Sequence, residues 1–122
     1  MSVASSEKTV SSRYGLRDRD MQTITDIFTR YPHIKTVHLF GSRAKGTFHS
    51  GSDIDLAIMN EDVPPKVMLQ LQNEFSESSL PYFVDLVYYP EIESAAFREH
   101  IERVGVVIYE RGTACRAPTV TS

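Results

Sequence analysis

The segment GSRAKGTFHSGSDIDLAIM, residues 41–59, places two aspartates, Asp53 and Asp55, one residue apart at the start of an apolar run. Like charges about 4 Å apart repel by roughly 4 kcal/mol at an effective dielectric constant near 20, and carboxylates resist burial unless something pairs with them. A bound cation is the simplest way to keep both acids ionised beside a buried strand. The spacing therefore indicates a cation site.

A third acid, Asp85, lies in the apolar segment 83–89. Because side chains alternate across a strand, Asp53 and Asp55 face one side of their strand, and Asp85 faces away from the apolar row of its own. If the two strands are neighbours, three carboxylates converge on a helix-free face of the sheet. Such oxygen ligands suit Mg²⁺ or Mn²⁺, which take further ligands from water and substrate phosphates. The alternative for Asp85 is an exposed acid on an edge strand.

The polar segment before the acids supplies groups that suit phosphate. Gly41 and Gly46 permit a tight turn whose backbone N–H groups, with the Ser42 hydroxyl, can approach phosphate oxygens. Arg43 and Lys45 add positive charge. A phosphate-binding turn a few residues before a metal-binding acid pair is the arrangement expected for transfer of part of a nucleoside triphosphate.

The elements that must position these residues follow from the hydrophobic periodicity. Helical spacing predicts a first helix from Asp18 or Asp20 to Pro32, a second over 63–79 and a third over 91–105. Strands are predicted over 34–40, 53–59, 83–89 and 106–109. The order α-β-β-α-β-α-β predicts an α/β (α+β) fold, a small mixed sheet with helices on one face.

Length and composition predict one folded domain. With 122 residues and 41% apolar content, the chain can form one modest core, which we place at 15–111 between flexible segments at 1–14 and 112–122. A net charge of -3 lacks the basic excess of duplex DNA-binding proteins. Cys115 is the single cysteine, which excludes an internal disulfide framework. No apolar run approaches the roughly 20 residues of a membrane span, so a soluble, cytoplasmic protein is expected.

The complete motif resembles the signature of the DNA polymerase beta-like nucleotidyltransferase superfamily. Gly41-Ser42 is followed, after ten residues, by Asp53-Ile54-Asp55, with HLF before the glycine, LAIM after the acids and Asp85 in a later strand. The likeness runs from about Gly15 to Arg111 and is greatest to the small stand-alone branch, the minimal nucleotidyltransferases. It implies the polymerase beta palm-like fold.

The resemblance also implies roles for the motif residues. Asp53 and Asp55 would bind the metals. Asp85 would complete the second metal site and help to deprotonate the acceptor hydroxyl. The residues on the triphosphate would be Gly41, Ser42, Arg43 and Lys45.

The reaction implied by the resemblance is transfer of a nucleoside monophosphate, commonly AMP from ATP, to a hydroxyl of a protein or RNA. Minimal nucleotidyltransferases are often paired with a helical HEPN-domain protein in toxin–antitoxin systems, so an antitoxin with a HEPN-domain partner is expected. The alternative is a non-catalytic, nucleotide-binding antitoxin that neutralises its partner by contact. A subunit of an antibiotic-modifying or RNA-tailing enzyme, and a homo-oligomer, also stay open.

Other interpretations of the motifs fit less well. The GxxxxG spacing of residues 41–46 matches part of a P-loop, but no Lys follows Gly46 and the next element is a predicted strand, where a P-loop needs a helix. Asp-Ile-Asp also resembles the aspartyl-phosphate phosphatases, in which the first Asp ends a strand instead of beginning it. The histidines show no zinc-site spacing and are interpreted as structural or solvated: His33, His38, His49 and His100.

Overall fold

The structure, a computed structural model, describes residues 13–49 and 51–111. Its elements in chain order are η1 (Arg13–Gly15), α2 (Asp18–Thr29), β1 (Thr36–Phe40), α3 (Gly41–Lys45), β2 (Ile54–Ile58), α4 (Pro65–Ser76), β3 (Val84–Tyr88), η2 (Tyr89–Glu91), α5 (Ala95–Val104) and β4 (Val106–Glu110). Cys115, residues 112–122 and most of the segment 1–14 lie outside the described residues. The domain boundaries therefore stay a prediction.

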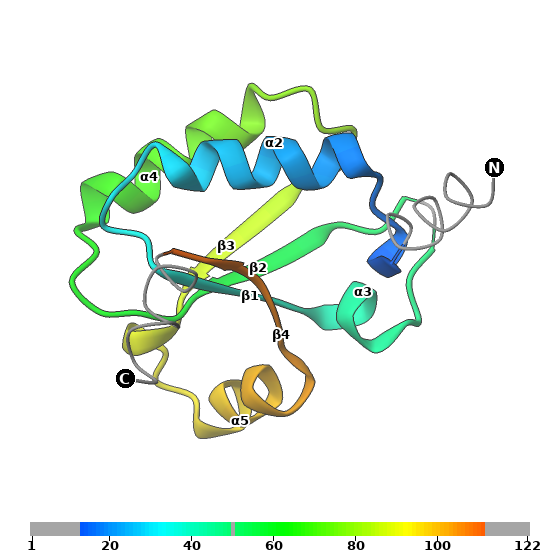
Figure 1. Cartoon of the computed structure of the whole chain (residues 1–122). Helices are drawn as coiled ribbons and strands as arrows, with labels where there is room; N and C mark the ends of the chain where they lie inside the picture. Colours follow the sequence, from blue (N-terminus) through cyan, green and yellow to red (C-terminus); the bar gives the residue numbers. More distant parts are fainter. Residues whose placement is uncertain (1–12, 50, 112–122) are drawn as a thin grey trace, which may run out of the picture.

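The four strands form one mixed sheet in the order β3-β2-β1-β4 (Figure 1). β1 runs antiparallel to both β2 and β4, whereas β2 and β3 are parallel and are joined by the α4 crossover. The predicted mixed sheet is confirmed. The two strands that carry the acids are neighbours, and β3 is an edge strand.

Helices α2 and α4 cover one face of the sheet (Figure 1). α2 begins where the sequence predicts, and the Asp20 carboxylate accepts a hydrogen bond from the Arg17 backbone N–H at 3.0 Å. The Phe28 ring of α2 lies 5.3 Å from Phe75 of α4 and 5.4 Å from Tyr109 of β4, centroid to centroid. These contacts belong to the larger apolar core. No helix in the described ranges is long and apolar enough to span a membrane.

Helix α5 lies on the opposite face, so the prediction that all helices share one face is wrong for this element (Figure 1). A second, smaller core forms there from Phe40 of β1, Ala57 of β2 and Ile101 of α5. The Phe97 ring of α5 packs edge-on against Phe40 with centroids 5.7 Å apart. Apolar side chains thus follow the acids along this face, and the amphipathic α5 removes them from water.

The polar segment predicted as a turn forms the short helix α3. Gly41 has φ +78°, which lets the chain change direction directly after β1, and Gly46 ends the helix in the left-handed region with φ +85°. Glycine adopts both conformations without the steric cost of a Cβ atom. α3 contacts both β1 and β2, which places the polar segment against the strand that carries the acid pair.

Candidate active site

The register of the two parallel strands brings the acids together. Asp55 of β2 is paired directly with Asp85 of β3, and neighbouring strands lie about 4.8 Å apart. Asp53 precedes β2 by one residue and is two residues from Asp55, so it lies toward the same face of the sheet. The predicted neighbourhood of Asp55 and Asp85 is confirmed, although this face also carries α5 and is not helix-free.

Electrostatics single out Asp55 within this acidic cluster, Asp53, Asp55 and Asp85. Burial, which has the largest effect, and the charges of Asp85 and Asp53 together raise the pKa of the Asp55 carboxyl to about 6. The Arg43 charge acts in the opposite direction. Asp53 and Asp85 are exposed, whereas Asp55 is only partly accessible. A half-buried carboxylate between two others is stabilised when a cation offsets the repulsion.

Gly41 lies directly against Asp55. A Cβ atom built on Gly41 would come within 2.2 Å of the Asp55 Oδ2 atom and 3.1 Å of its Cγ atom. Glycine is therefore required here both for its positive φ and for this close approach. The backbone of the predicted phosphate-binding segment thus adjoins the acidic cluster, and Ser42, the next residue, is partly accessible.

Arg43 has a different environment from the one the sequence predicts. Its side chain is only 1% exposed. Its Nε and one terminal nitrogen donate to the Ser52 carbonyl at 3.2 and 2.8 Å, and the other donates to the Tyr14 carbonyl at 2.8 Å. The guanidinium lies between the rings of Phe48, at 5.2 Å, and Tyr82, at 4.4 Å. The guanidinium is thus committed to protein partners, so these contacts give no support to the predicted contact between Arg43 and the triphosphate, which stays a prediction.

The Arg43 contacts reveal a supporting group that the motif does not predict. Ser52 precedes the first acid of the pair, and Tyr82 lies shortly before β3 and Asp85. One side chain of α3 therefore connects the approaches to both acid-bearing strands. Nothing in the local spacing relates Tyr82 to Arg43, because the two are far apart in the sequence.

The remaining candidate residues are Lys45 and two of the histidines, His49 and His38. Lys45 ends α3 with an exposed side chain, so its contact with the triphosphate stays a prediction. His49 is exposed, and its backbone N–H donates to the Ser52 hydroxyl at 2.8 Å. His38 faces the α5 side, where burial lowers its pKa and its Nδ1 atom has no hydrogen-bond partner in the part of the chain described here.

The groups of the acidic cluster that could bind a cation are carboxylate oxygens. Within residues 13–49 and 51–111, no three His, Cys, Asp or Glu side chains are grouped closely enough to form a complete metal site. Mg²⁺ is commonly held by only one or two carboxylates and completes its shell with water and substrate phosphates. The hard oxygen donors and the raised Asp55 pKa therefore fit a divalent cation that arrives together with a polyphosphate.

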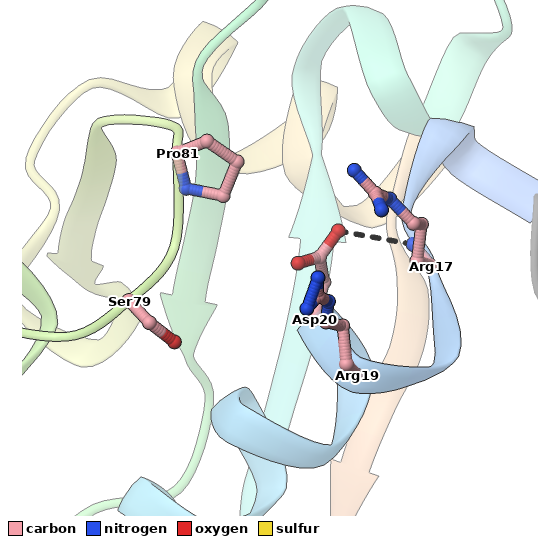
Figure 2. Close-up of a pocket in the computed structure, with 5 residues that line it drawn as sticks. All are labelled: Arg17, Arg19, Asp20, Ser79 and Pro81. Carbon is pink, nitrogen blue, oxygen red and sulfur yellow. Dashed lines mark hydrogen bonds between the residues drawn. The ribbon is translucent and has the colours of Figure 1, made fainter.

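A separate pocket of about 250 Å³ lies between the start of α2 and the loop that leads into β3 (Figure 2). Its lining residues are Arg17, Arg19, Asp20, Ser79 and Pro81. Figure 2 shows the Asp20 carboxylate turned toward the Arg17 backbone, to which it is hydrogen-bonded. None of the acidic cluster lines this pocket, so it does not contain the predicted chemistry.

Comparison with known proteins decides the family. Residues 22–114 match the sequence profile of the family described as "Polymerase beta, Nucleotidyltransferase". The chain belongs to this nucleotidyltransferase family. The matched range contains α3, both acid-bearing strands and α5. The resemblance inferred from the glycine, serine and aspartate spacing is confirmed.

A curated relative supports the same assignment of this nucleotidyltransferase. The chain is 37% identical over 107 residues to the "Probable protein adenylyltransferase MntA" of Haemophilus influenzae, covering 85% of this chain and 91% of the relative.

Two solved structures share the fold of this chain. A chain of a toxin–antitoxin complex crystallised with AMP-PNP superposes with a TM-score of 0.63 at 24% identity, covering 84% of this chain and 82% of that one. A chain of the complex of tri-AMPylated Shewanella oneidensis HEPN toxin with MNT antitoxin gives a TM-score of 0.56 at 20% identity, with coverage of 83% and 78%. At these identities the likeness establishes the fold of the nucleotidyltransferase.

Proposed function

We propose that this nucleotidyltransferase moves AMP from ATP to a hydroxyl of a protein, as the antitoxin of a toxin–antitoxin pair. The observation that carries the proposal is the direct pairing of Asp55 with Asp85, with the Gly41 backbone against the Asp55 carboxylate. The 37% identity to a relative named as a probable protein adenylyltransferase supports a protein acceptor and adenylyl transfer.

The acidic cluster would hold the divalent cation, Mg²⁺ or Mn²⁺. When bound, such a cation neutralises the charge of the triphosphate and of the leaving pyrophosphate. Gly41, Ser42 and Lys45 would contact the triphosphate. The acceptor oxygen attacks the α-phosphorus, a new P–O bond forms, and the bond from the α-phosphorus to the bridging oxygen breaks. The hydroxyl proton passes to the Asp85 carboxylate, and pyrophosphate carries away the displaced charge.

The partner that we propose is a HEPN-domain protein. Structures that share this fold contain a HEPN toxin with its MNT antitoxin, and one such toxin is AMPylated. A hydroxyl carried by that partner would then serve as the protein acceptor. ATP and a protein partner meet in the cytoplasm, where we place the reaction.

The experiment that tests the function combines purified chain, Mg²⁺, each α-³²P-labelled nucleoside triphosphate and a lysate of source cells that lack the chain. We expect label from ATP on a protein, and we expect at least about a 100-fold loss when Asp53→Ala and Asp55→Ala are combined, because electrostatic stabilisation at the reacting centre is lost. A matched control removes two exposed acids elsewhere, Glu61→Ala with Glu77→Ala, and is expected to label as the wild type does.

The binding-only alternative predicts a different pattern. An antitoxin that works by contact would protect cells from its toxin equally well as wild type and as the Asp53→Ala, Asp55→Ala variant, with no label transferred by either. Transfer by the wild type that survives in the double variant would contradict the assignment of the acidic cluster as the active site.

A further inference from the structure

Phe83 is a large apolar side chain that the fold leaves in water beside the acidic cluster. It is 62% exposed and directly precedes β3. Its carbonyl accepts a hydrogen bond from the Ile54 N–H at 2.9 Å, so the ladder between β2 and β3 continues through it. Alternation along the strand then puts the Phe83 ring on the same face as Asp85, two residues further on.

The backbone around Phe83 is fixed from both sides. On the outer edge of β3, the Gln72 side chain donates to the Val84 carbonyl at 2.7 Å. The preceding residue, Tyr82, stacks on the buried Arg43 guanidinium. An exposed ring on a fixed backbone loses little conformational entropy when a partner covers it, which is a property of a preformed contact.

The order of the strands assigns opposite sides of the cluster to the two substrates. α3 follows β1, which lies on one side of β2, whereas Asp85 lies in β3 on the other side, and Phe83 directly precedes that strand. A triphosphate held by α3 and the acid pair thus approaches from the β1 side. The acceptor hydroxyl must reach Asp85, so its carrier approaches across the β3 edge and passes over Phe83.

We propose that the Phe83 ring is a binding contact for the acceptor polypeptide and sets the affinity for that substrate without contributing to nucleotide binding. This inference rests on the proposed function, since it concerns the second substrate of the same site. The other large exposed apolar residues of the described ranges are Leu69 on α4, which covers the opposite face of the sheet, and Val107 on β4, the edge strand farthest from β3. Position beside Asp85 is what distinguishes Phe83 from them.

The test is steady-state transfer to the most strongly labelled protein of the lysate assay, purified and used as the acceptor. For Phe83→Ala we expect the acceptor KM to rise about tenfold, with kcat and the KM for ATP within about twofold of wild type, because the buried apolar area of the complex is lost. Phe83→Leu, which keeps part of that area, is expected to raise the acceptor KM only about threefold. Leu69→Ala, at a residue 64% exposed, is the matched control and leaves all three constants unchanged.

The outcomes separate this inference from the proposed function. If the wild type labels no protein, the proposed function fails and the inference fails with it. If the wild type labels its acceptor but Phe83→Ala leaves the acceptor KM unchanged, the inference is wrong and the function stands. A rise in the KM for ATP, or weaker AMP-PNP binding measured by calorimetry, would place the ring on the nucleotide and would also overturn the inference.

Discussion

The Asp55 carboxylate is half-buried between two other acids and against the Gly41 backbone. Its pKa is raised from 3.8 to about 6, so between these values the folded chain keeps a proton that the unfolded chain has released. Folding stability therefore falls as the pH rises from about 4 to 6, which is opposite to the behaviour of a salt-bridged aspartate. At neutral pH the ionised Asp55 carboxylate therefore lowers the folding stability of the protein. Such a loss of stability is common at residues that natural selection keeps for their activity.

The first prediction is that Asp55→Asn stabilises the protein while it removes activity. In EDTA at pH 7 we expect the free energy of unfolding to rise by about 1 kcal/mol, a value discounted for the partial solvent exposure of the site. At pH 4, where the native carboxyl is protonated, the difference should nearly vanish. Urea unfolding at the two pH values measures it, and a destabilised variant at pH 7 would contradict the electrostatic account.

The second prediction concerns the contact between Gly41 and Asp55. Gly41→Ala would place a methyl group 2.2 Å from the Asp55 Oδ2 atom at a φ of +78°. The carboxylate must move, so we expect at least about a 100-fold loss of transfer together with a stability loss of about 1–3 kcal/mol. Gly46→Ala is the matched control: φ is +85° but a Cβ atom there meets nothing within 4 Å. It should show the backbone cost without the loss of transfer.

At the scale of elements, Arg43 joins segments that share no regular hydrogen-bonded structure. From α3 it binds the carbonyl of Tyr14 in η1 and that of Ser52 before β2, and it stacks on Tyr82 before β3. Hydrogen bonds that involve a charged donor contribute about 1.5–3 kcal/mol each, and a cation–π contact adds about 0.5–2 kcal/mol. The approaches to the acidic cluster are thereby held by one side chain.

The third prediction is that Arg43 acts on stability and geometry more than on ATP affinity. Lysine keeps the charge but lacks the planar fork, so Arg43→Lys should lose about 2 kcal/mol of unfolding free energy. The KM for ATP should stay within about threefold of wild type while kcat falls. Lys45→Ala, on an exposed residue of the same helix, should change stability by less than about 0.5 kcal/mol. A stable Arg43→Lys variant with a greatly raised KM for ATP would restore Arg43 as a triphosphate ligand.

Local patterns predict some elements of this fold better than others. The helix at Asp18 and the strand around Asp55 follow from apolar spacing, because each buries one face over several residues. α3 could not be predicted, since five residues that begin with glycine carry no periodic signal. The candidate site was also only partly predictable. The proximity of Asp55 and Asp85 follows from the alternation of side chains along strands. The burial of Arg43 depends on Tyr82, which only the tertiary structure brings near. Ala57 is apolar and lies on the same face of β2 as Asp55, which was the sequence signal that a helix covers part of this face.

At the scale of the whole molecule, one face of the sheet carries the larger apolar core and the other carries the acidic cluster. The α2 and α4 side holds the larger apolar core, which accounts for most of the buried side chains in the described residues. On the other side the small core under α5 covers only part of the sheet and leaves the acids accessible. Repulsion among carboxylates can be tolerated there because the larger core provides the stability that the cluster removes.

The last prediction is that cation and nucleotide together stabilise the whole domain. Ligand at ten times its Kd adds RT ln 11, about 1.4 kcal/mol, which corresponds to a rise in Tm of about 6–11 °C for a domain of this size. Mg²⁺ with AMP-PNP should therefore raise the Tm of the wild type and of Phe83→Ala equally, since Phe83 is assigned to the acceptor. Asp55→Asn should start from a higher Tm and gain little, because its amide no longer repels the neighbouring acids or attracts the cation. Calorimetric scans at increasing ligand concentration measure this, and an equal shift in Asp55→Asn would show that the nucleotide binds elsewhere.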